Sequence, residues 1–490
     1  MTDDSPGHEG YSPIPRLAEA GRYEEALVAI QRHLFDSPKD GEALNDAGAI
    51  LHALGRFDEA AEHLKRALAH LEGDPAAEAL RNLAEVYLSS DRPAEAEALF
   101  GDLAKAGVLS AELANRAVNG FLKQADPAGA VEALLRSLEI CPGQAPLVPV
   151  LEKLRNLRAK IAMFHPAGLT KAMGCVHDFL AKRFQLRLFQ GESTEELTRM
   201  LHWCDIAWFE DCTRQLAIAS KAAKRWRIVC RLRLEGAYSP WVEQVHWENV
   251  DLLIAPPNQA ILGYFSRRVP ELPNRTRIAA IPDGVDTARF AFQDRPRGRN
   301  LACIGRVDLL HNPMFLLQCF RQLRASDGQY RMFFAGMFTD DRVEQYLRQA
   351  IKHMGLSAAV SFDGYQEDLP AWLADKHYVV SAEVASLQPT SVLEAMACGL
   401  RPVVHRFPGA QDFLGDDYLF ATPEDFCRQI VREPYEPTAY RDMAAGRFEL
   451  NRQLATVNGM LRELEKMPSL KVRPGASPVA APAAKDGAEA

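Results

Sequence analysis

The sequence predicts two architectures in one chain: an array of helical repeats, followed by two α/β domains with parallel sheets. Similar segments recur in the first third of the chain, and short apolar strands alternate with helical stretches in the rest. The chain has 490 residues, of which 47% are hydrophobic and 25% charged, as in ordinary globular proteins. These values are sufficient for several domains, each with its own core.

The repeats are defined by alanines at equivalent positions of four similar segments. These alanines are separated by 34, 36 and 34 residues, and they are Ala26, Ala60, Ala96 and Ala130. Gly21 and Gly55 are also 34 residues apart. Each unit predicts two amphipathic helices joined by a tight turn, with alanine where the helices pack closely.

This pattern resembles the tetratricopeptide repeat (TPR) over about residues 16–145. The second unit keeps its consensus best, at Leu44, Ala47, Gly48, Leu51, Phe57, Ala60, Leu64 and Ala67. The resemblance implies a concave groove, and we expect a protein or peptide partner there. A module that serves only for dimerisation or scaffolding is the alternative.

From Lys160 onward, short apolar runs alternate with helical patterns. The expected strands are 161–164, 186–189, 205–209, 227–232 and 252–255, then 277–281, 301–304, 332–335, 360–362, 378–381 and 402–405. Helical crossovers between strands indicate parallel sheets, and the turn Ile281–Asp286 divides the two series. We therefore expect two doubly wound domains, with ligands bound beyond the carboxyl ends of the strands.

The expected domain organisation follows from these patterns. Residues 1–15 are expected to be disordered, 16–157 to form the repeats, 158–283 the first α/β domain and 284–467 the second. The last helix, Thr438–Lys466, is expected to cross back to the first α/β domain. The Pro/Ala-rich segment 468–490 is expected to be disordered.

Two segments after strands contain residues suited to bind an anion. Gly305 ends a strand, Arg306 follows it, and His311 comes five positions later. Arginine suits phosphate because its planar guanidinium donates two parallel hydrogen bonds. A surface ion pair for Arg306 and a packing role for His311 are the alternatives.

In the second segment, Pro389, Thr390 and Ser391 precede a helix that carries Glu394. The free N–H groups at such a helix start favour an anion, and Glu394 is placed to accept from ribose hydroxyls. The alternative needs no ligand, because Ser391 and Glu394 have the spacing of a capping box.

Together these segments resemble the retaining glycosyltransferases of family 4 (GT4), which have two Rossmann-like domains in the GT-B fold. The matching strings are 394–399 (EAMACG) with 402–404 (PVV), 281–286 (IPDGVD) with Phe290, and 305–307 (GRV) with 312–313 (NP). The resemblance covers about residues 160–465 and is strongest after residue 277.

The resemblance implies that Arg306 and the position of His311 hold the diphosphate of a nucleotide-sugar, and that Glu394 contacts its ribose. It makes Arg306, His311 and Glu394 the catalytic candidates. The other donor-binding candidates are Gly305, Ser386, Pro389, Thr390 and Ser391. It also implies catalysis without a metal or a cofactor.

The sequence departs from the family pattern at two positions. His311 replaces the usual lysine, so the charge there is expected to depend on pH. Ser386 replaces the first acid of the family's E-x7-E motif, which touches the donor sugar. Glu383 is the alternative acid.

The first α/β domain offers candidates on the acceptor side. Gly168 and Gly174 stand where the family has a glycine pair, and Arg233, Glu235 and Tyr238 follow a strand. A loop that only caps the core is the alternative for 231–241.

Charge and cysteine usage limit the cellular setting. The net charge of -8 disfavours nucleic acid as a partner. Nine scattered cysteines without CxxC suggest a reducing compartment without a zinc site. The acidic start MTDDSPGHEG does not resemble a signal peptide, and no apolar run approaches the ~20 residues of a membrane span. We expect a cytoplasmic protein.

A basic run raises the alternative of contact with a membrane surface. It comprises Lys221, Lys224, Arg225, Arg227, Arg231 and Arg233. A solvated helix end next to a strand explains the same residues.

The resulting hypothesis is a glycosyltransferase with a nucleotide-sugar donor. A protein acceptor presented by the repeats follows from a resemblance to repeat-fused bacterial transferases. A polysaccharide or lipid-linked acceptor, with the repeats recruiting a complex, is the alternative acceptor. The alternative is an adaptor whose second half has lost catalysis.

Overall fold

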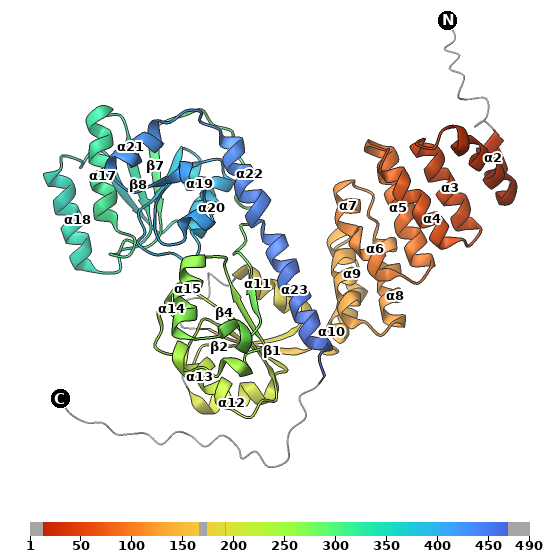
Figure 1. The fold of residues 1–490 in the computed structure, drawn as a ribbon, viewed down its shortest axis with the longest axis horizontal. Coiled ribbons are helices and arrows are strands. Elements are labelled where there is room, and N and C mark those ends of the chain that lie inside the picture. Colours follow the sequence, from red (N-terminus) through yellow and green to blue (C-terminus); the bar gives the residue numbers. More distant parts are fainter. Residues whose placement is uncertain (1–12, 166–173, 192, 469–490) are drawn as a thin grey trace, which may run out of the picture. The chain divides into compact units, whose positions relative to one another are not determined.

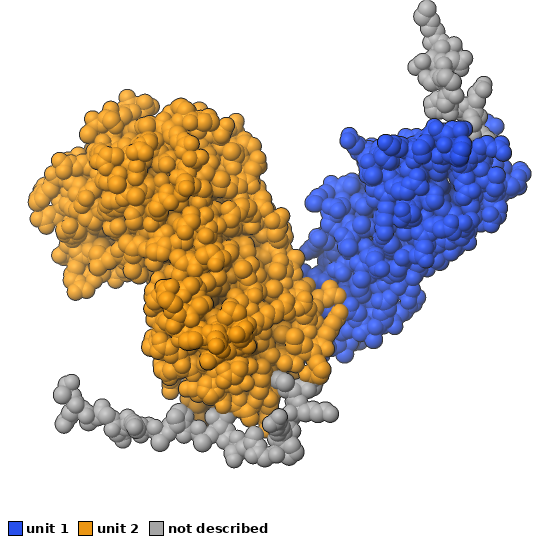
Figure 2. Space-filling model, in the orientation of Figure 1, with its two compact units in different colours: residues 1–159, 181–185 blue, residues 160–180, 186–490 orange. Residues whose placement is uncertain are grey.

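The computed structural model describes residues 13–165, 174–191 and 193–468 (Figure 1). The chain forms two compact units (Figure 2). Unit 1 comprises residues 1–159 and 181–185, and unit 2 comprises residues 160–180 and 186–490.

Unit 1 is helical, and consecutive helices pack against each other. Its helices are α1 (Pro13–Glu19), α2 (Tyr23–Asp36), α3 (Gly41–Ala53), α4 (Phe57–Leu68), α5 (Gly73–Ser89), α6 (Pro93–Ala98), α7 (Phe100–Lys105), α8 (Ala111–Lys123), α9 (Pro127–Ile140) and α10 (Val148–Asn156). The four alanines that define the period are fully buried between helices. Helix α1 includes residues 13–15, which the sequence analysis assigned to a disordered segment.

The turn before the second helix of each repeat has a left-handed backbone. The first two copies use glycine, with φ of 71° at Gly21 and 75° at Gly55. The later copies have Asp91 at φ 56° and Ala125 at φ 54°. A Cβ atom in this conformation is unfavourable by about 1 kcal/mol or more, so the later turns are strained.

Residues 181–185 belong to unit 1, although the sequence analysis placed them in the first α/β domain. Arg183 makes a bidentate ion pair with Glu132 of α9, at 2.8 Å from Nε to Oε1 and 2.8 Å from Nη2 to Oε2. The guanidinium of Arg158 stacks 3.8 Å from the ring centre of Phe184, which is fully buried. These contacts are distant in the sequence, so no local pattern predicts them.

Unit 2 contains two six-stranded sheets, and the fold class predicted from the sequence is confirmed. The first sheet has the order β2-β1-β3-β4-β5-β6 and the second β12-β11-β10-β7-β8-β9. The strands are β1 (Lys160–Phe164), β2 (Gln185–Phe189), β3 (Ile206–Glu210), β4 (Arg227–Arg231), β5 (Leu252–Ala255), β6 (Ile278–Ala280), β7 (Asn300–Ile304), β8 (Arg331–Ala335), β9 (Val360–Gly364), β10 (Tyr378–Ser381), β11 (Arg401–His405) and β12 (Leu419–Phe420). Strand β12 was not predicted, because its two residues are too few to show the pattern of a strand.

Helices connect the strands and cover the sheets (Figure 1). They are α11 (Gly174–Arg183), α12 (Thr194–Trp203), α13 (Arg214–Lys221), α14 (Leu234–Tyr238), α15 (Gln259–Arg268), α16 (Leu272–Arg275), α17 (Pro313–Ser326), α18 (Asp341–His353), α19 (Leu369–Leu373), α20 (Thr390–Ala397), α21 (Pro423–Val431), α22 (Pro437–Phe448) and α23 (Leu450–Lys466). Trp208 and Phe209 are fully buried in the first sheet, as is Tyr378 in the second.

The single helix predicted over Thr438–Lys466 is wrong, because it is two helices separated at Glu449. Glu449 is extended, with φ −69° and ψ 131°, and its carboxylate accepts from the N–H of Arg452 at 3.0 Å. The backbone on either side pairs with Val285: Val285 N–H donates to Phe448 O at 2.6 Å, and Leu450 N–H donates to Val285 O at 3.0 Å. Helix α23 then returns to the first α/β domain, where Glu463 pairs with Arg277 at 2.6 Å.

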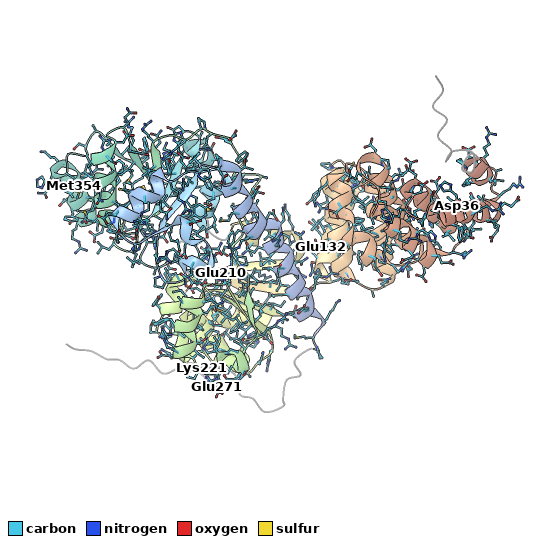
Figure 3. All side chains as sticks on the ribbon, turned by 45° about the horizontal axis from the view of Figure 1, so that its top comes forward. Asp36, Glu132, Glu210, Lys221, Glu271 and Met354 are labelled. Carbon is cyan, nitrogen blue, oxygen red and sulfur yellow. The ribbon has the colours of Figure 1, made fainter. Side chains whose placement is uncertain are left out.

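The linker between the two sheets is held by a buried ionic network around Asp283. Its carboxylate contacts Arg231 Nη2 and lies 3.1 Å from Arg233 Nη1. Both arginines also face Glu210 at 3.4 Å. Glu210, which Figure 3 labels, is the last residue of β3. Burial alone would raise the pKa of Asp283, but Arg231 and Arg233 hold it well below its usual range.

Two glutamines complete this network from elsewhere in the chain. Gln388 bonds both backbone groups of Asp283, accepting from its N–H at 2.8 Å and donating to its C=O at 2.6 Å. Gln453 of α23 donates to the Asp283 carboxylate at 3.1 Å and accepts from Gly284 N–H at 2.9 Å. Asp283 thus joins the linker to the segment before α20 and to the last helix.

The basic run at residues 221–233 does not form one charged surface. Lys224 and Arg227 both pair with Asp251, at 2.9 Å and 3.0 Å. Arg231 is buried, and both it and Arg233 belong to the Asp283 network. Most of the charge that suggested a membrane contact is therefore neutralised inside unit 2.

We predict that Ala125→Gly stabilises unit 1 by about 0.5–1 kcal/mol, because glycine removes the cost of the left-handed turn at an exposed site. All six tryptophans lie in unit 2. Tryptophan fluorescence therefore reports the unfolding of unit 2 alone, whereas circular dichroism reports the unfolding of both units. A transition seen only by circular dichroism belongs to unit 1. Ala49→Gly, at an exposed position inside α3, is the matched control and should destabilise unit 1. Equal changes in the stability of unit 1 for Ala125→Gly and Ala49→Gly would contradict backbone strain at Ala125.

We predict that Asp283→Asn destabilises unit 2 by about 3–5 kcal/mol, because it leaves one buried and one partly buried guanidinium group with a single counter-charge, Glu210. Denaturant unfolding followed by tryptophan fluorescence measures this. Asp327→Asn breaks the exposed ion pair with Arg299 and should hardly move the midpoint. A small effect of Asp283→Asn would show that the network contributes little.

Candidate functional site

The second sheet places its candidate site where the strand order reverses. Strands β7 and β10 are neighbours, but their crossovers lead in opposite directions. In such sheets the ligand binds between the loops that follow these two strands. The loops touch, because Val384 N–H donates to Leu310 O at 3.0 Å. Candidates separated by about 80 residues in the sequence therefore lie in one place.

Glycines allow the loop after β7 to pack tightly. Gly305 has φ 138°, and a Cβ atom there would lie 3.1 Å from the ring of His311. A Cβ atom at Gly336 would lie 1.7 Å from the Gly305 carbonyl oxygen. Gly305 therefore shapes the site through close packing with His311.

His311 lies between two carboxylates. Its Nδ1 is 2.7 Å from Asp308 Oδ1, and its Nε2 is 4.0 Å from Glu383 Oε1. Burial acts to raise the pKa of Asp308, but the hydrogen bonds and charge of His311, together with the charge of Arg306, outweigh it and lower the value. The ionised Asp308 assigns a proton to Nδ1, so Nε2 is the nitrogen directed at Glu383. The packing alternative for His311 is thus incomplete, because the ring also has polar partners.

Arg306 extends from the same loop and is accessible. Its side chain is 57% exposed, with Nε 3.5 Å from Asp308 and Nη2 3.6 Å from Glu235 of the first α/β domain. Exposed pairs at these distances are weak. An anionic ligand could therefore replace them at little cost.

Glu383 follows β10, and its side chain is only 13% exposed. The hydroxyl groups of Ser381 and Ser386 lie beside its carboxylate. Burial raises its pKa, while His311 and the two serines act in the opposite direction. Ser386, at the position of the missing acid, thus lies next to another acid of the site.

Helix α20 begins at Thr390, after Pro389. The capping-box alternative for Ser391 and Glu394 is wrong, because Ser391 already lies inside the helix and its hydroxyl donates to Ile304 O at 3.4 Å. Burial raises the pKa of Glu394 to about 7, and Arg289 acts in the opposite direction. A carboxylate of this kind gains from a ligand that donates hydrogen bonds.

The acceptor-side candidates separate into two groups. Arg233 belongs to the Asp283 network, so the alternative of a structural loop applies to it. Glu235 is exposed and near Arg306. Tyr238 is 48% exposed and stacks on Tyr264, with ring centres 4.7 Å apart. Tyr264 was not predicted as a site residue, because no local pattern in the sequence points to it.

Gly174 begins α11, and a Cβ atom there would have no atom within 4 Å. Packing therefore does not require glycine at this position. Gly168 lies outside the described residues. The described part of the chain contains no cluster of three His, Cys, Asp or Glu residues that could hold a metal ion.

Part of the second α/β domain matches a known sequence family. Residues 298–433 match the family model of the glycosyl transferases, group 1. Residues 40–105 match that of the tetratricopeptide repeat. The resemblance to glycosyl transferases fused to TPR is confirmed, and the family match includes the loops after β7 and β10.

Solved glycosyl transferases share the fold of unit 2. Anabaena HepE in complex with UDP is 16% identical with a TM-score of 0.54, covering 62% of this chain and 100% of its own. HepE in complex with UDP-glucose is 18% identical with a TM-score of 0.51, and the match covers 62% of this chain and 98% of that one. A glycosyltransferase from Rickettsia africae is 11% identical with a TM-score of 0.50, and the match covers 63% of this chain and 99% of that one. A comparison with curated proteins found no match.

Among the helices of residues 13–165, 174–191 and 193–468, none is sufficiently long and apolar to cross a bilayer.

We predict that Glu394→Gln stabilises unit 2 increasingly as the pH rises. The folded-state pKa of Glu394 is about 7, against its ordinary 4.5. The stability contributed by the protonated carboxyl is therefore present at low pH and is lost as the pH rises through this range. Glutamine imitates the protonated form at every pH. Thermal unfolding followed by tryptophan fluorescence, at about pH 6 and about pH 8, measures the difference.

The control is Glu367→Gln at an exposed position, which should give no pH-dependent difference. A difference for Glu394→Gln that stays constant with pH would contradict the raised pKa.

Proposed function

We propose that this protein transfers a sugar from a nucleotide-activated donor, which binds between the loops after β7 and β10. The observation that carries the proposal is the combination at that point of an exposed guanidinium, Arg306, with a buried carboxylate, Glu383. A nucleotide-sugar presents the complementary groups, an anionic diphosphate and neutral sugar hydroxyls. The match to glycosyl transferases group 1 over the same loops supports the assignment.

Arg306 and the start of α20 take the diphosphate in this proposal. Arg306 supplies charge-assisted hydrogen bonds, and the first turn of α20 supplies backbone N–H groups. Negative charge increases on the diphosphate as the bond to the sugar breaks. Fixed positive groups stabilise that charge, a role that a metal ion has in other enzymes. Metal independence is therefore part of the proposal.

Glu383 and His311 form the polar surface for the transferred sugar. A buried carboxylate prefers neutral donors, and sugar hydroxyls are such donors. Glu394, one turn into α20, is proposed to accept from the ribose. Gly305 and Ser386 shape the loops in which these groups lie. Retention of the anomeric configuration rests on the resemblance of residues 394–399 to family 4.

UDP is the first nucleotide to test, because the solved HepE complexes contain UDP and UDP-glucose. A protein acceptor is proposed from the repeats, whose family commonly binds peptides. We place the protein in the bacterial cytoplasm. An adaptor function is the competing proposal, and the serine at position 386 favours it because the family has an acid there.

We predict that UDP, or another of GDP, ADP and CMP, raises the unfolding temperature of unit 2, and that Arg306→Ala weakens its binding about 10- to 100-fold. Glu383→Gln should leave nucleotide binding intact and remove transfer from the corresponding nucleotide-sugar. Tryptophan fluorescence during heating measures the first effect, and release of nucleotide measures the second.

The control is Arg299→Ala, an exposed arginine paired with Asp327, which should change neither quantity. Stabilisation of the wild-type protein by none of the four nucleotides would overturn the proposal in favour of the adaptor.

A further inference from the structure

Asn258 is a buried amide that joins the first α/β domain to the candidate donor site. It follows β5 and caps α15, where its Oδ1 accepts from Ile261 N–H at 3.0 Å. Its Nδ2 reaches the second domain and donates to Ser386 O at 2.9 Å. The same nitrogen lies 3.4 Å from both Leu387 O and Pro408 O. Asn258 is 0% exposed, so water cannot replace these bonds.

The loop after β11 is shaped around this side chain. Gly409 has φ 90°, and a Cβ atom there would lie 2.1 Å from Asn258 Oδ1. The next residue of the first domain, Gln259, donates its N–H to Asp412 Oδ2 at 2.7 Å. Two loops at the carboxyl edge of the second sheet are therefore fixed to the same short segment, 258–259.

The contacts require an amide. The oxygen end meets an N–H group, and the nitrogen end meets three carbonyl oxygens. Aspartate has the same shape, but it would place a negative oxygen against those carbonyls. Serine can cap a helix but is too short to replace the amide nitrogen.

Ser386 extends these contacts to the proposed sugar-binding group. Its carbonyl is held by Asn258, while its side chain lies beside the Glu383 carboxylate three residues earlier in the same loop. Glu383 in turn lies 4.0 Å from His311 Nε2. A movement of the Ser386 backbone therefore moves Glu383 relative to His311.

We propose that Asn258 is a positioning residue that sets the donor loop, residues 383–389, from the first α/β domain. Asn258 touches no reacting group, and its effect passes through Ser386 to Glu383. The effect on catalysis rests on the proposed function, whereas the fixing of the loop does not. Diphosphate binding through Arg306 belongs to the loop after β7 and is independent of Asn258.

Asn258→Ser and Asn258→Asp in the full chain test the proposal, because both keep a cap for α15. Amide hydrogen exchange should accelerate in residues 383–388 and stay unchanged at Ile261 and in the first turn of α20. The kcat for transfer from UDP-glucose should fall about tenfold or more, since small displacements in an active site are costly. The Kd for UDP should change less than threefold (roughly), because Arg306 stays in place. A merely structural role would not separate the two constants in this way.

The matched control is Ser193→Ala, which removes the cap of α12, where Ser193 Oγ accepts from Glu196 N–H at 3.3 Å. It should lower stability without altering exchange in residues 383–388. Unchanged exchange there in both Asn258 variants would overturn the proposal, and faster exchange with unchanged kcat would overturn its catalytic part. Faster exchange in a protein that binds none of the four nucleotides would instead refute the proposed function and leave the positioning role standing.

Discussion

The Asp283 carboxylate lies between the guanidinium groups of Arg231 and Arg233 with only 15% of its side chain exposed, and the arrangement of unit 2 depends on this contact. Charges that are largely removed from water are tolerated only when they are paired and hydrogen-bonded. The linker between the sheets therefore has one favourable position, in which its carboxylate meets the arginines at and after the end of β4. Gln388 and Gln453 bind the same residue, so the segment before α20 and the last helix are fixed with it.

The donor loop is a second place where one residue serves two partners. Ser386 is held by Asn258 through its carbonyl, and its side chain lies beside Glu383. A serine at this position removes an acid from the family pattern, but a buried carboxylate remains three residues earlier. The chemical character of the site is thus retained by a different residue. The surrounding loops, with Gly305 and Gly409, have the backbone shapes that this arrangement requires.

The fold was predictable where the pattern is local or repeated. The alanine period identified the helical repeats, and the alternation of strands and helices predicted both sheets. Arg306 and His311 could be chosen because each follows a strand, and the strand order brings their loop to that of Glu383. The break at Glu449 was missed because the helical pattern continues on both sides of it.

The remaining contacts join residues that are distant in the chain. Asn258 and Ser386 are 128 positions apart, and Gly284 and Gln453 are 169 positions apart. No pattern in a single sequence links such pairs. Arg233 illustrates the same limit, because its position after a strand suggested a ligand contact. Its actual partners, Glu210 and Asp283, come from other elements.

The place of Gln453 in the chain has a consequence for protein synthesis. Helix α23 is translated after both sheets, yet it supplies a hydrogen bond to a carboxylate at the edge of the first. The first α/β domain therefore leaves the ribosome with its ionic network incomplete, whereas the helices of unit 1 pack mainly on their neighbours in the sequence, and residues 181–185 complete that unit soon afterwards. The repeats can fold during translation, and unit 2 reaches its final state only when the last helix has been released.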